Sequence, residues 1–321
     1  MATIRRRASD LLGPNMRKAY ALEIKSICDE FLRQVEVPFK IPEVDPAFYA
    51  DCCRAARDWG IPLDGTINIL PYLRIGTDLA ELAYGHMSHE TQIYVALFTA
   101  AIVGCEDACT SDIELLKTFG QRFIKGQKHG NPILDSYDLL LRELAERFEP
   151  FAAEAMLQSA LDFFVGLVLE YELKQQPTLA RPAQEFPNFL RVLTGVSRLY
   201  TILMFPDGIP LRSWMESLPS MISYIHHVND IFSFYKEELV NECNNFISIK
   251  AQSGGKTKLE ALQSLADETV DTVKEIIAVL AHNQDALEAF KDFHKGYVYF
   301  HTACNRYKMA ELWAYNGEDA E

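Results

Sequence analysis

The sequence predicts an all-α fold. Apolar residues recur at spacings of three and four over most of the 321 residues, whereas runs that alternate apolar and polar residues are scarce. The segments with the helical period are rich in Leu, Ala, Glu, Lys and Gln, all of which favour helices. Prolines fall between these segments, and no proline follows Pro219, which permits long helices in the final third.

Five helices are expected in the first half of the chain. The third contains the longest uncharged stretch, Thr91–Cys105, whose fifteen residues are too few to span a membrane. We therefore expect it to be a buried core helix. Pro132 marks the gap before the fifth helix. These five helices are predicted at residues 47–58, 66–84, 89–105, 111–126 and 133–147.

Five further helices are expected in the second half. Prolines mark the gaps between the first three of them, and Gly254-Gly255 marks the clear break in the last third. These helices are predicted at residues 149–174, 185–204, 211–240, 257–282 and 285–314, with gap prolines at 150, 177, 182, 187, 206 and 210.

No repeat, low-complexity tract or linker divides the chain, so residues 1–321 are predicted to form a single domain. Residues 1–20 are expected either to be disordered or to close over the functional site. The net charge of −14 argues against nucleic acid or an anionic membrane as the main partner. Seven cysteines without a regular framework, and no signal peptide behind Met1–Arg7, predict reduced thiols and a cytoplasmic protein.

The most informative segment is residues 229–237. Asn229, Ser233 and Glu237 are spaced four apart, so on an α-helix they share one narrow face, drifting by about 40° per step. An amide oxygen, a hydroxyl and a carboxylate are hard donors that suit Mg²⁺. The alternative is a polar stripe on a solvated helix. The apolar residues of 221–225 and 231–235 make this alternative a poor fit, because such a helix is largely buried and its polar groups need partners.

This pattern resembles the second metal-binding motif of class I terpene synthases, and its flanks resemble the fungal trichodiene synthase family. The resemblance covers about residues 90 to 312 and is most specific at the metal motif and at Arg306-Tyr307. The supporting segments are Ser159–Phe164, Phe186–Arg191, His294–Val298 and Asn305–Lys308.

The resemblance implies a class I terpenoid synthase helical bundle around a deep central active-site pocket. It further implies that three Mg²⁺ ions and bound diphosphate meet in the pocket, with one ion held by Asn229, Ser233 and Glu237. The metal ions would let an acidic protein face an anionic substrate. The donors implied for the diphosphate are Arg191, Lys236, Arg306 and Tyr307.

Each of the three cations has a plainer interpretation. Arg191 could be a surface residue, Lys236 could lie over Phe232, and Arg306 could pair with Glu311. Their order and places in the chain favour the functional interpretation.

The first metal motif departs from the family pattern, Asp-Asp-x-x-Asp/Glu. An ungapped comparison anchored on Phe98 and Phe119 puts Cys105 at the leading aspartate, Glu106 second and Cys109 last. Sliding by one residue makes Glu106-Asp107 the acidic pair, with Thr110 in place of the final acid. Glu106 and Asp107 are our candidate metal ligands, and Asp112 is a candidate outer acid. The alternative is an acidic helix end followed by an N-cap at Thr110 or Ser111.

Other groups are assigned by position or by elimination. Cys105 and Cys109 lack two further soft ligands for zinc and are interpreted as core thiols, and the pairs His86/His89 and His226/His227 as structural or surface residues. Aromatic faces stabilise cations without offering a nucleophile. Family position selects as pocket candidates Phe98, Phe163, Phe164, Tyr200, Phe232, Tyr299 and Tyr307.

The predicted function is Mg²⁺-dependent ionisation of a linear prenyl diphosphate, farnesyl or also geranyl, to a sesquiterpene or monoterpene plus diphosphate. The degenerate first motif favours early quenching to an acyclic tertiary alcohol such as nerolidol or linalool. Two alternatives remain: a catalytically silent helical bundle that binds prenyl chains or partners, and a chain-elongating prenyltransferase. The resemblance adds a homodimer as a candidate assembly.

Overall fold

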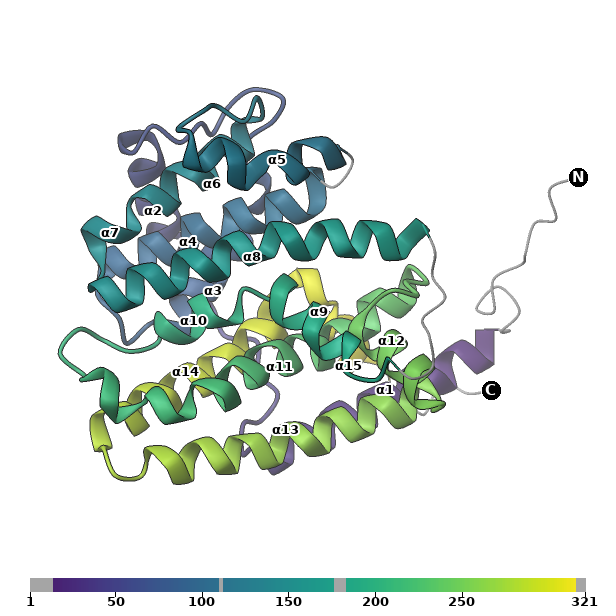
Figure 1. The fold of residues 1–321 in the computed structure, drawn as a ribbon. Helices are drawn as coiled ribbons and strands as arrows, with labels where there is room; N and C mark the ends of the chain where they lie inside the picture. Colours follow the sequence, from purple (N-terminus) through teal and green to yellow (C-terminus); the bar gives the residue numbers. More distant parts are fainter. Residues whose placement is uncertain (1–13, 110–111, 176–182, 316–321) are drawn as a thin grey trace, which may run out of the picture.

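The computed structural model describes residues 14–109, 112–175 and 183–315, and within these ranges it contains helices and no strand (Figure 1). The predicted all-α fold is confirmed. The α-helices are α1 (Pro14–Gln34), α2 (Pro46–Asp58), α3 (Leu70–Ala83), α4 (His89–Gly104), α5 (Ile113–Ile124), α6 (Pro132–Arg142), α7 (Leu144–Arg147), α8 (Pro150–Gln175), α9 (Phe186–Thr194), α10 (Ser197–Ile202), α11 (Leu218–Leu239), α12 (Phe246–Gly254), α13 (Lys258–Leu280), α14 (Gln284–Ala303) and α15 (Met309–Ala314). A π-turn, η2 (Cys105–Cys109), continues α4, and the 3₁₀ turns are η3 (Leu211–Ser213), η4 (Met215–Ser217) and η5 (Asn305–Tyr307).

Local capping sets where several helices begin. The Asp45 side chain accepts from the Ala47 amide, and Pro46 occupies the first turn of α2, where its missing N–H costs nothing. Thr257 and Glu260 form a reciprocal capping box at the start of α13. These short-range signals explain why the beginnings of α2 and α13 fall within one residue of their predicted positions.

Two glycines allow close approach of the central helices. A Cβ atom on Gly76 of α3 would lie 2.0 Å from the Ala96 carbonyl oxygen of α4. A Cβ atom on Gly296 of α14 would lie 1.8 Å from the Leu82 carbonyl oxygen of α3. Helix α3 therefore packs backbone to backbone against both α4 and α14, and this places their other faces around a common interior.

Helices α1 and α12 are absent from the predicted set. Helix α1 lies along α13 at the outside of the bundle (Figure 1) and buries Ala21, Ile24, Cys28 and Phe31, which repeat at helical spacing. Residues 14–20 belong to α1, and residues 1–13 lie outside the described residues. Helix α12 is short and begins at the Asn245 cap, so it offers little periodicity in sequence.

Four predicted helices are broken: 133–147 divides into α6 and α7, 211–240 begins as η3 and η4 before α11, and the other two breaks lie near the pocket described below. The one expected at 185–204 divides into α9 and α10 at Val196, whose φ of 47° is left-handed and cannot continue an α-helix. The one expected at 285–314 ends at Ala303, and Lys308 with φ 60° separates η5 from α15. Arg191 precedes the first break and Arg306 lies in η5 within the second, and both line the pocket described below.

Helix α8 alone, among the described helices, is long and apolar enough to cross a membrane by length and composition. It packs against α5, α7, α9 and α10, and it buries Phe163, Phe164 and Leu167. A core helix of a bundle meets the same criterion, and this packing places α8 in the core. The six cysteines whose side chains are described form no disulfide among themselves.

Candidate active site

A pocket of about 240 Å³ opens between α3, α4, α8, α9, α11, α14 and η5. Its lining changes character along each of the long helices. Ile102 and Val103 of α4 precede Glu106 of η2, and on α8 Phe163 and Leu167 precede Glu170. The same order holds on α11 and on α14 with η5, where apolar or aromatic lining residues precede the charged ones. The pocket therefore has an apolar wall and one charged end.

The polar motif of α11 lies at this charged end. Asn229 and Glu237 line the pocket, as does Lys236, whose Nζ atom is 3.5 Å from Glu237 Oε1. Ser233 stands between them on the helix and does not reach the pocket lining; its Oγ atom is buried without a hydrogen-bond partner. Lys236 is thus turned toward the pocket rather than over Phe232, whose ring packs against Phe31 and His301.

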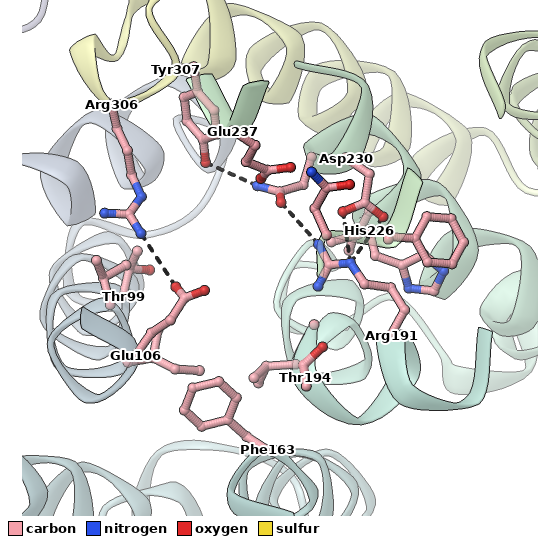
Figure 2. A pocket seen from close by; sticks show the side chains of 18 of the residues that line it. Thr99, Glu106, Phe163, Arg191, Thr194, His226, Asp230, Glu237, Arg306 and Tyr307 are labelled. Atoms are coloured by element: carbon pink, nitrogen blue, oxygen red, sulfur yellow. Dashed lines mark hydrogen bonds and ion pairs between the residues drawn. The ribbon is translucent and has the colours of Figure 1, made fainter. Parts of the chain in front are cut away.

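Arg191 of α9 reaches the same place from the opposite wall (Figure 2). Its Nε atom donates to both oxygens of Asp230, at 2.9 and 3.0 Å, and its Nη2 atom donates to Asn229 Oδ1 at 3.0 Å. The side chain is 16% exposed, so the surface interpretation is wrong. Burial raises the pKa of Asp230 to about 6, and the Arg191 charge opposes a larger rise, so the two form a buried ion pair at neutral pH.

Arg306 of η5 contacts the π-turn that follows α4. It donates to both oxygens of Asp107, at 2.7 and 3.0 Å, and lies 3.5 Å from Glu106 Oε2. Its predicted alternative partner, Glu311, instead accepts from Tyr235, so that alternative is wrong. The neighbouring Tyr307 lines the pocket, and its hydroxyl accepts from Asn229 Nδ2 at 3.1 Å (Figure 2).

The π-turn after α4 separates the roles of the first-motif residues. Cys105 is fully buried, as expected of a core thiol, whereas Glu106 lines the pocket and Asp107 binds Arg306. The wider turn shifts the side chains that follow it relative to those of α4. Asp112 stands directly before α5 and is exposed; Thr110, Ser111 and the Cys109 side chain lie outside the described residues.

Three acidic residues that sequence reasoning missed complete this end of the pocket. Asp230 lies within the segment 229–237, and it is the partner of Arg191. Glu170 and Glu242 both line the pocket. Burial, and then the Glu106 charge, raises the pKa of Glu170 to about 7. Nothing in the sequence near Glu170 or Glu242 distinguishes them from surface acids, because their neighbours come from distant helices.

The aromatic lining agrees only in part with prediction. Phe163, Tyr200 and Tyr307 line the pocket as expected, whereas the expected Phe98, Phe164, Phe232 and Tyr299 do not. Phe98, Phe164 and Phe232 pack within ring clusters of the core. The aromatic lining residues that were missed are Phe246, Tyr297 and Phe300.

The predictions for the histidine pairs also agree only in part with the structure. His86 binds the Met204 carbonyl and His89 is exposed beside Asp51, in agreement with structural and surface roles. His226, by contrast, lines the pocket, with its Nδ1 atom 3.2 Å from Ser197 Oγ. Burial lowers its pKa well below the ordinary value, so the ring is neutral.

A family model described as trichodiene synthase matches residues 69–321, which includes the pocket-lining residues named above. The chain belongs to the trichodiene synthase family. It is 33% identical over 302 residues to an alpha-cuprenene synthase of Coprinopsis cinerea, with 93% of each chain covered. It is 30% identical to monoterpene synthase 25 of Postia placenta, over 90% of this chain and 86% of that one. It is therefore an enzyme that makes terpenes from a prenyl diphosphate, and the silent-bundle alternative is disfavoured.

Solved structures agree with the fold of the trichodiene synthase family. A linalool/nerolidol synthase from Streptomyces clavuligerus, in complex with 2-fluorogeranyl diphosphate, matches with a TM-score of 0.61 at 14% identity, covering 79% of this chain and 98% of that one. A germacradien-4-ol synthase from Streptomyces citricolor matches with a TM-score of 0.56 at 14% identity, covering 84% and 99%. The class I terpenoid synthase fold predicted from the sequence is confirmed.

The charged end of this terpene synthase fits a magnesium site by its donors. The buried Ser233 hydroxyl has no hydrogen-bond partner in the protein, so its oxygen could bind a metal ion. Asn229 and Glu237 supply two more hard oxygen donors on the same helix. Glu106 and Glu170 offer carboxylates across the pocket. Among the described residues, no group of three His, Cys, Asp or Glu side chains is placed to hold a metal ion.

Proposed function

We propose that this enzyme ionises farnesyl diphosphate, and also geranyl diphosphate, with the help of three Mg²⁺ ions, and releases a sesquiterpene or monoterpene. The observation that carries the proposal is the meeting of two arginines, a lysine and the oxygen ligands of α11 at one end of an aromatic pocket. The relative named as a monoterpene synthase and the structural neighbour bound to 2-fluorogeranyl diphosphate support the inclusion of a ten-carbon substrate.

Asn229, Ser233 and Glu237 would hold one Mg²⁺, and Glu106 would hold metal from the facing wall. Bound magnesium supplies positive charge that stabilises the departing diphosphate. Arg191, Lys236, Arg306 and the Tyr307 hydroxyl bind the diphosphate oxygens, since Arg presents a planar fork of donors. These contacts strengthen as the allylic C–O bond breaks and its electron pair leaves with the diphosphate.

The apolar wall then holds the carbocation away from bulk water. Phe163, Tyr200, Tyr297 and Phe300 present rings to this space, and each ring face contributes about 0.5–2 kcal/mol of cation stabilisation. The cation is quenched by loss of an adjacent C–H proton, which gives an alkene, or by addition of water with loss of a proton. We propose the second route, to nerolidol from farnesyl and linalool from geranyl diphosphate, because the first metal motif is incomplete.

The test is incubation of the full chain with each diphosphate, with and without Mg²⁺, followed by gas chromatography and mass spectrometry of the extract. We expect Mg²⁺-dependent terpene alcohols, lost in Asn229→Ala and Glu237→Ala. Ser223→Ala, on the same helix but outside the pocket lining, is the control and should retain activity. Cyclic products would overturn the quenching step alone, whereas folded protein that converts neither substrate would overturn the proposed substrates.

We also propose that the enzyme acts in the cytoplasm, without nucleic acid or membrane partners, as a homodimer. The free thiols and the net charge of −14 support the first two statements. Analytical ultracentrifugation at micromolar concentration tests the third, and a single species at the 36.5 kDa mass of one chain would contradict it.

A further inference from the structure

A fully buried histidine, His301, lies directly behind the proposed metal ligand Asn229. Its Nδ1 atom is 2.7 Å from the Tyr297 carbonyl oxygen, one turn earlier in α14. A carbonyl oxygen only accepts hydrogen bonds, so Nδ1 carries the ring proton. The ring is packed against the aromatic rings of Phe232, Phe300 and Tyr307, an environment that disfavours a charge. A neutral ring protonated at Nδ1 leaves Nε2 with a lone pair.

That lone pair faces the Asn229 amide. His301 Nε2 is 3.3 Å from Asn229 Nδ2, which also donates to the Tyr307 hydroxyl at 3.1 Å. Both amide hydrogens are therefore used. The amide oxygen points the other way and accepts from Arg191 Nη2 at 3.0 Å. A carbonyl oxygen has two acceptor positions, so one remains for a further ligand.

The contacts with His301 and with Arg191 both exclude the opposite orientation of the Asn229 amide. Rotation by 180° would set the amide oxygen against the His301 lone pair and the NH₂ group against the Arg191 guanidinium. Each of these contacts would pair two acceptors or two donors in a partly buried place, at a cost of about 1–3 kcal/mol per unsatisfied group. An Asp at this position would meet the same His301 lone pair with an oxygen.

The orientation of the Asn229 amide also determines the hydrogen bonding of the Tyr307 hydroxyl. Because the Tyr307 oxygen accepts from Asn229, its own hydrogen is available in another direction. Tyr307 is 5% exposed and lines the pocket, so this hydrogen is available to a ligand in the pocket. A single histidine tautomer thus sets two groups at the charged end.

We propose that His301 is a positioning residue: its unprotonated Nε2 fixes the Asn229 amide with the oxygen toward the metal site and leaves the Tyr307 hydroxyl to donate to the diphosphate. The proposal rests on the proposed function in one respect, the role of Asn229 as a metal ligand. It accounts for an amide rather than a carboxylate at position 229, since only the amide can donate to Nε2.

The first test measures Mg²⁺ binding to the full chain by titration calorimetry in the presence of inorganic diphosphate and without a prenyl substrate. His301→Phe keeps the ring and removes the acceptor, and we expect its Mg²⁺ affinity to fall by about tenfold or more, as for other residues that orient metal ligands. His301→Gln offers both a donor for Tyr297 and an acceptor for Asn229, so it should recover most of the affinity. His294→Phe, on the same helix and outside the pocket lining, is the matched control and should bind Mg²⁺ as the unaltered protein does.

Wild-type affinity in His301→Phe would overturn the proposal. Loss of affinity in His301→Gln equal to that in His301→Phe would overturn it as well, because the hydrogen-bond pattern would then be irrelevant. If the unaltered protein converts prenyl diphosphates but Asn229→Ala does not weaken Mg²⁺ binding, the inference fails while the proposed reaction stands. If neither conversion nor Mg²⁺ binding occurs, the proposed function has failed and the inference falls with it.

A second measurement does not depend on the folding of His301→Phe. In protein labelled with ¹⁵N-histidine, two-bond ¹H–¹⁵N correlation spectra distinguish a protonated ring nitrogen from one with a lone pair, and the signal missing in His301→Gln assigns His301. We expect protonation at Nδ1 and a free Nε2 that shifts when Mg²⁺ and inorganic diphosphate are added. A proton on Nε2 would overturn the proposal.

Discussion

Arg306 and Asp107, 199 residues apart in the sequence, form a two-bonded ion pair, with Nη1–Oδ2 at 2.7 Å and Nη2–Oδ1 at 3.0 Å. The pair ties the C-terminal turn η5 to the π-turn after α4. It also divides the two acids of the first motif, since Asp107 faces the arginine while Glu106 lines the pocket. The structure thus assigns different tasks to neighbours that the sequence left equivalent.

This division predicts different losses in two substitutions that each remove one negative charge. Glu106→Gln should weaken Mg²⁺ binding in the presence of inorganic diphosphate by about tenfold or more, because a pocket carboxylate is lost. Asp107→Asn should leave Mg²⁺ affinity within about threefold and instead lower the turnover rate, because the Arg306 fork loses its anchor. Calorimetry and steady-state kinetics on both variants separate the effects. The reverse pattern would make Asp107 the ligand.

Restoring an aspartate at Cys105 should damage the protein rather than improve it. Cys105 is 0% exposed, so a carboxylate there would be buried within the core. We expect Cys105→Asp to lower the free energy of unfolding by about 3 kcal/mol or more, and Cys105→Ala to cost clearly less. Urea denaturation measures both. An active Cys105→Asp variant of unchanged stability would show that Cys105 does occupy the position of a metal ligand.

Glu170 predicts a pH-dependent stability in the absence of metal. Its pKa is raised to about 7, so its contribution to stability is fully present below about pH 4.5 and is lost as the pH rises through about 7. Relative to Glu170→Gln, the unaltered protein should therefore lose up to about 3 kcal/mol of stability between pH 4.5 and pH 8. Urea denaturation at pH 5, 6.5 and 8 tests this. The exposed Glu172, on the same helix, supplies the control Glu172→Gln, which should show no such trend.

Two glycine-to-alanine substitutions are expected to change the free energy of unfolding in opposite directions, one at the contact between α3 and α4 and one in α5. Gly76→Ala would place a methyl group 2.0 Å from the Ala96 carbonyl oxygen, so the helices must separate, at a cost of about 3 kcal/mol. Gly120→Ala, in α5, meets nothing within 4 Å and should stabilise by about 0.5–1 kcal/mol through helix propensity. Thermal and urea unfolding compare the two. A tolerated Gly76→Ala would contradict the close crossing.

Many residues of the candidate site could be predicted from the sequence. The metal motif of α11 is a matter of spacing on one helix, so Asn229, Ser233 and Glu237 were found without knowledge of the fold. Arg191, Lys236, Arg306 and Tyr307 followed from the family resemblance. The structure brings Asn229, Glu237 and these four residues to one pocket, and it buries Ser233 beside them.

Other features depend on partners that are far apart in the chain. Whether an aromatic ring lines the pocket or the core is set by the helix opposite it, which is why Phe232 and Phe164 were misplaced. Glu170 is distinguished from the exposed Glu172 only by what surrounds it, namely burial and the charge of Glu106.

The sequence by itself therefore determined the helical class, most helix positions and the polar face of α11 that we propose as a metal site, because periodicity, capping and i, i+4 spacing act within a few residues. The tertiary structure alone decided which first-motif acid faces the pocket, where α9 and α14 end, and which side-chain amide the His301 ring faces. These are outcomes of burial, charge pairing and hydrogen-bond satisfaction between residues up to about two hundred positions apart, and such contacts exist only once the chain has folded.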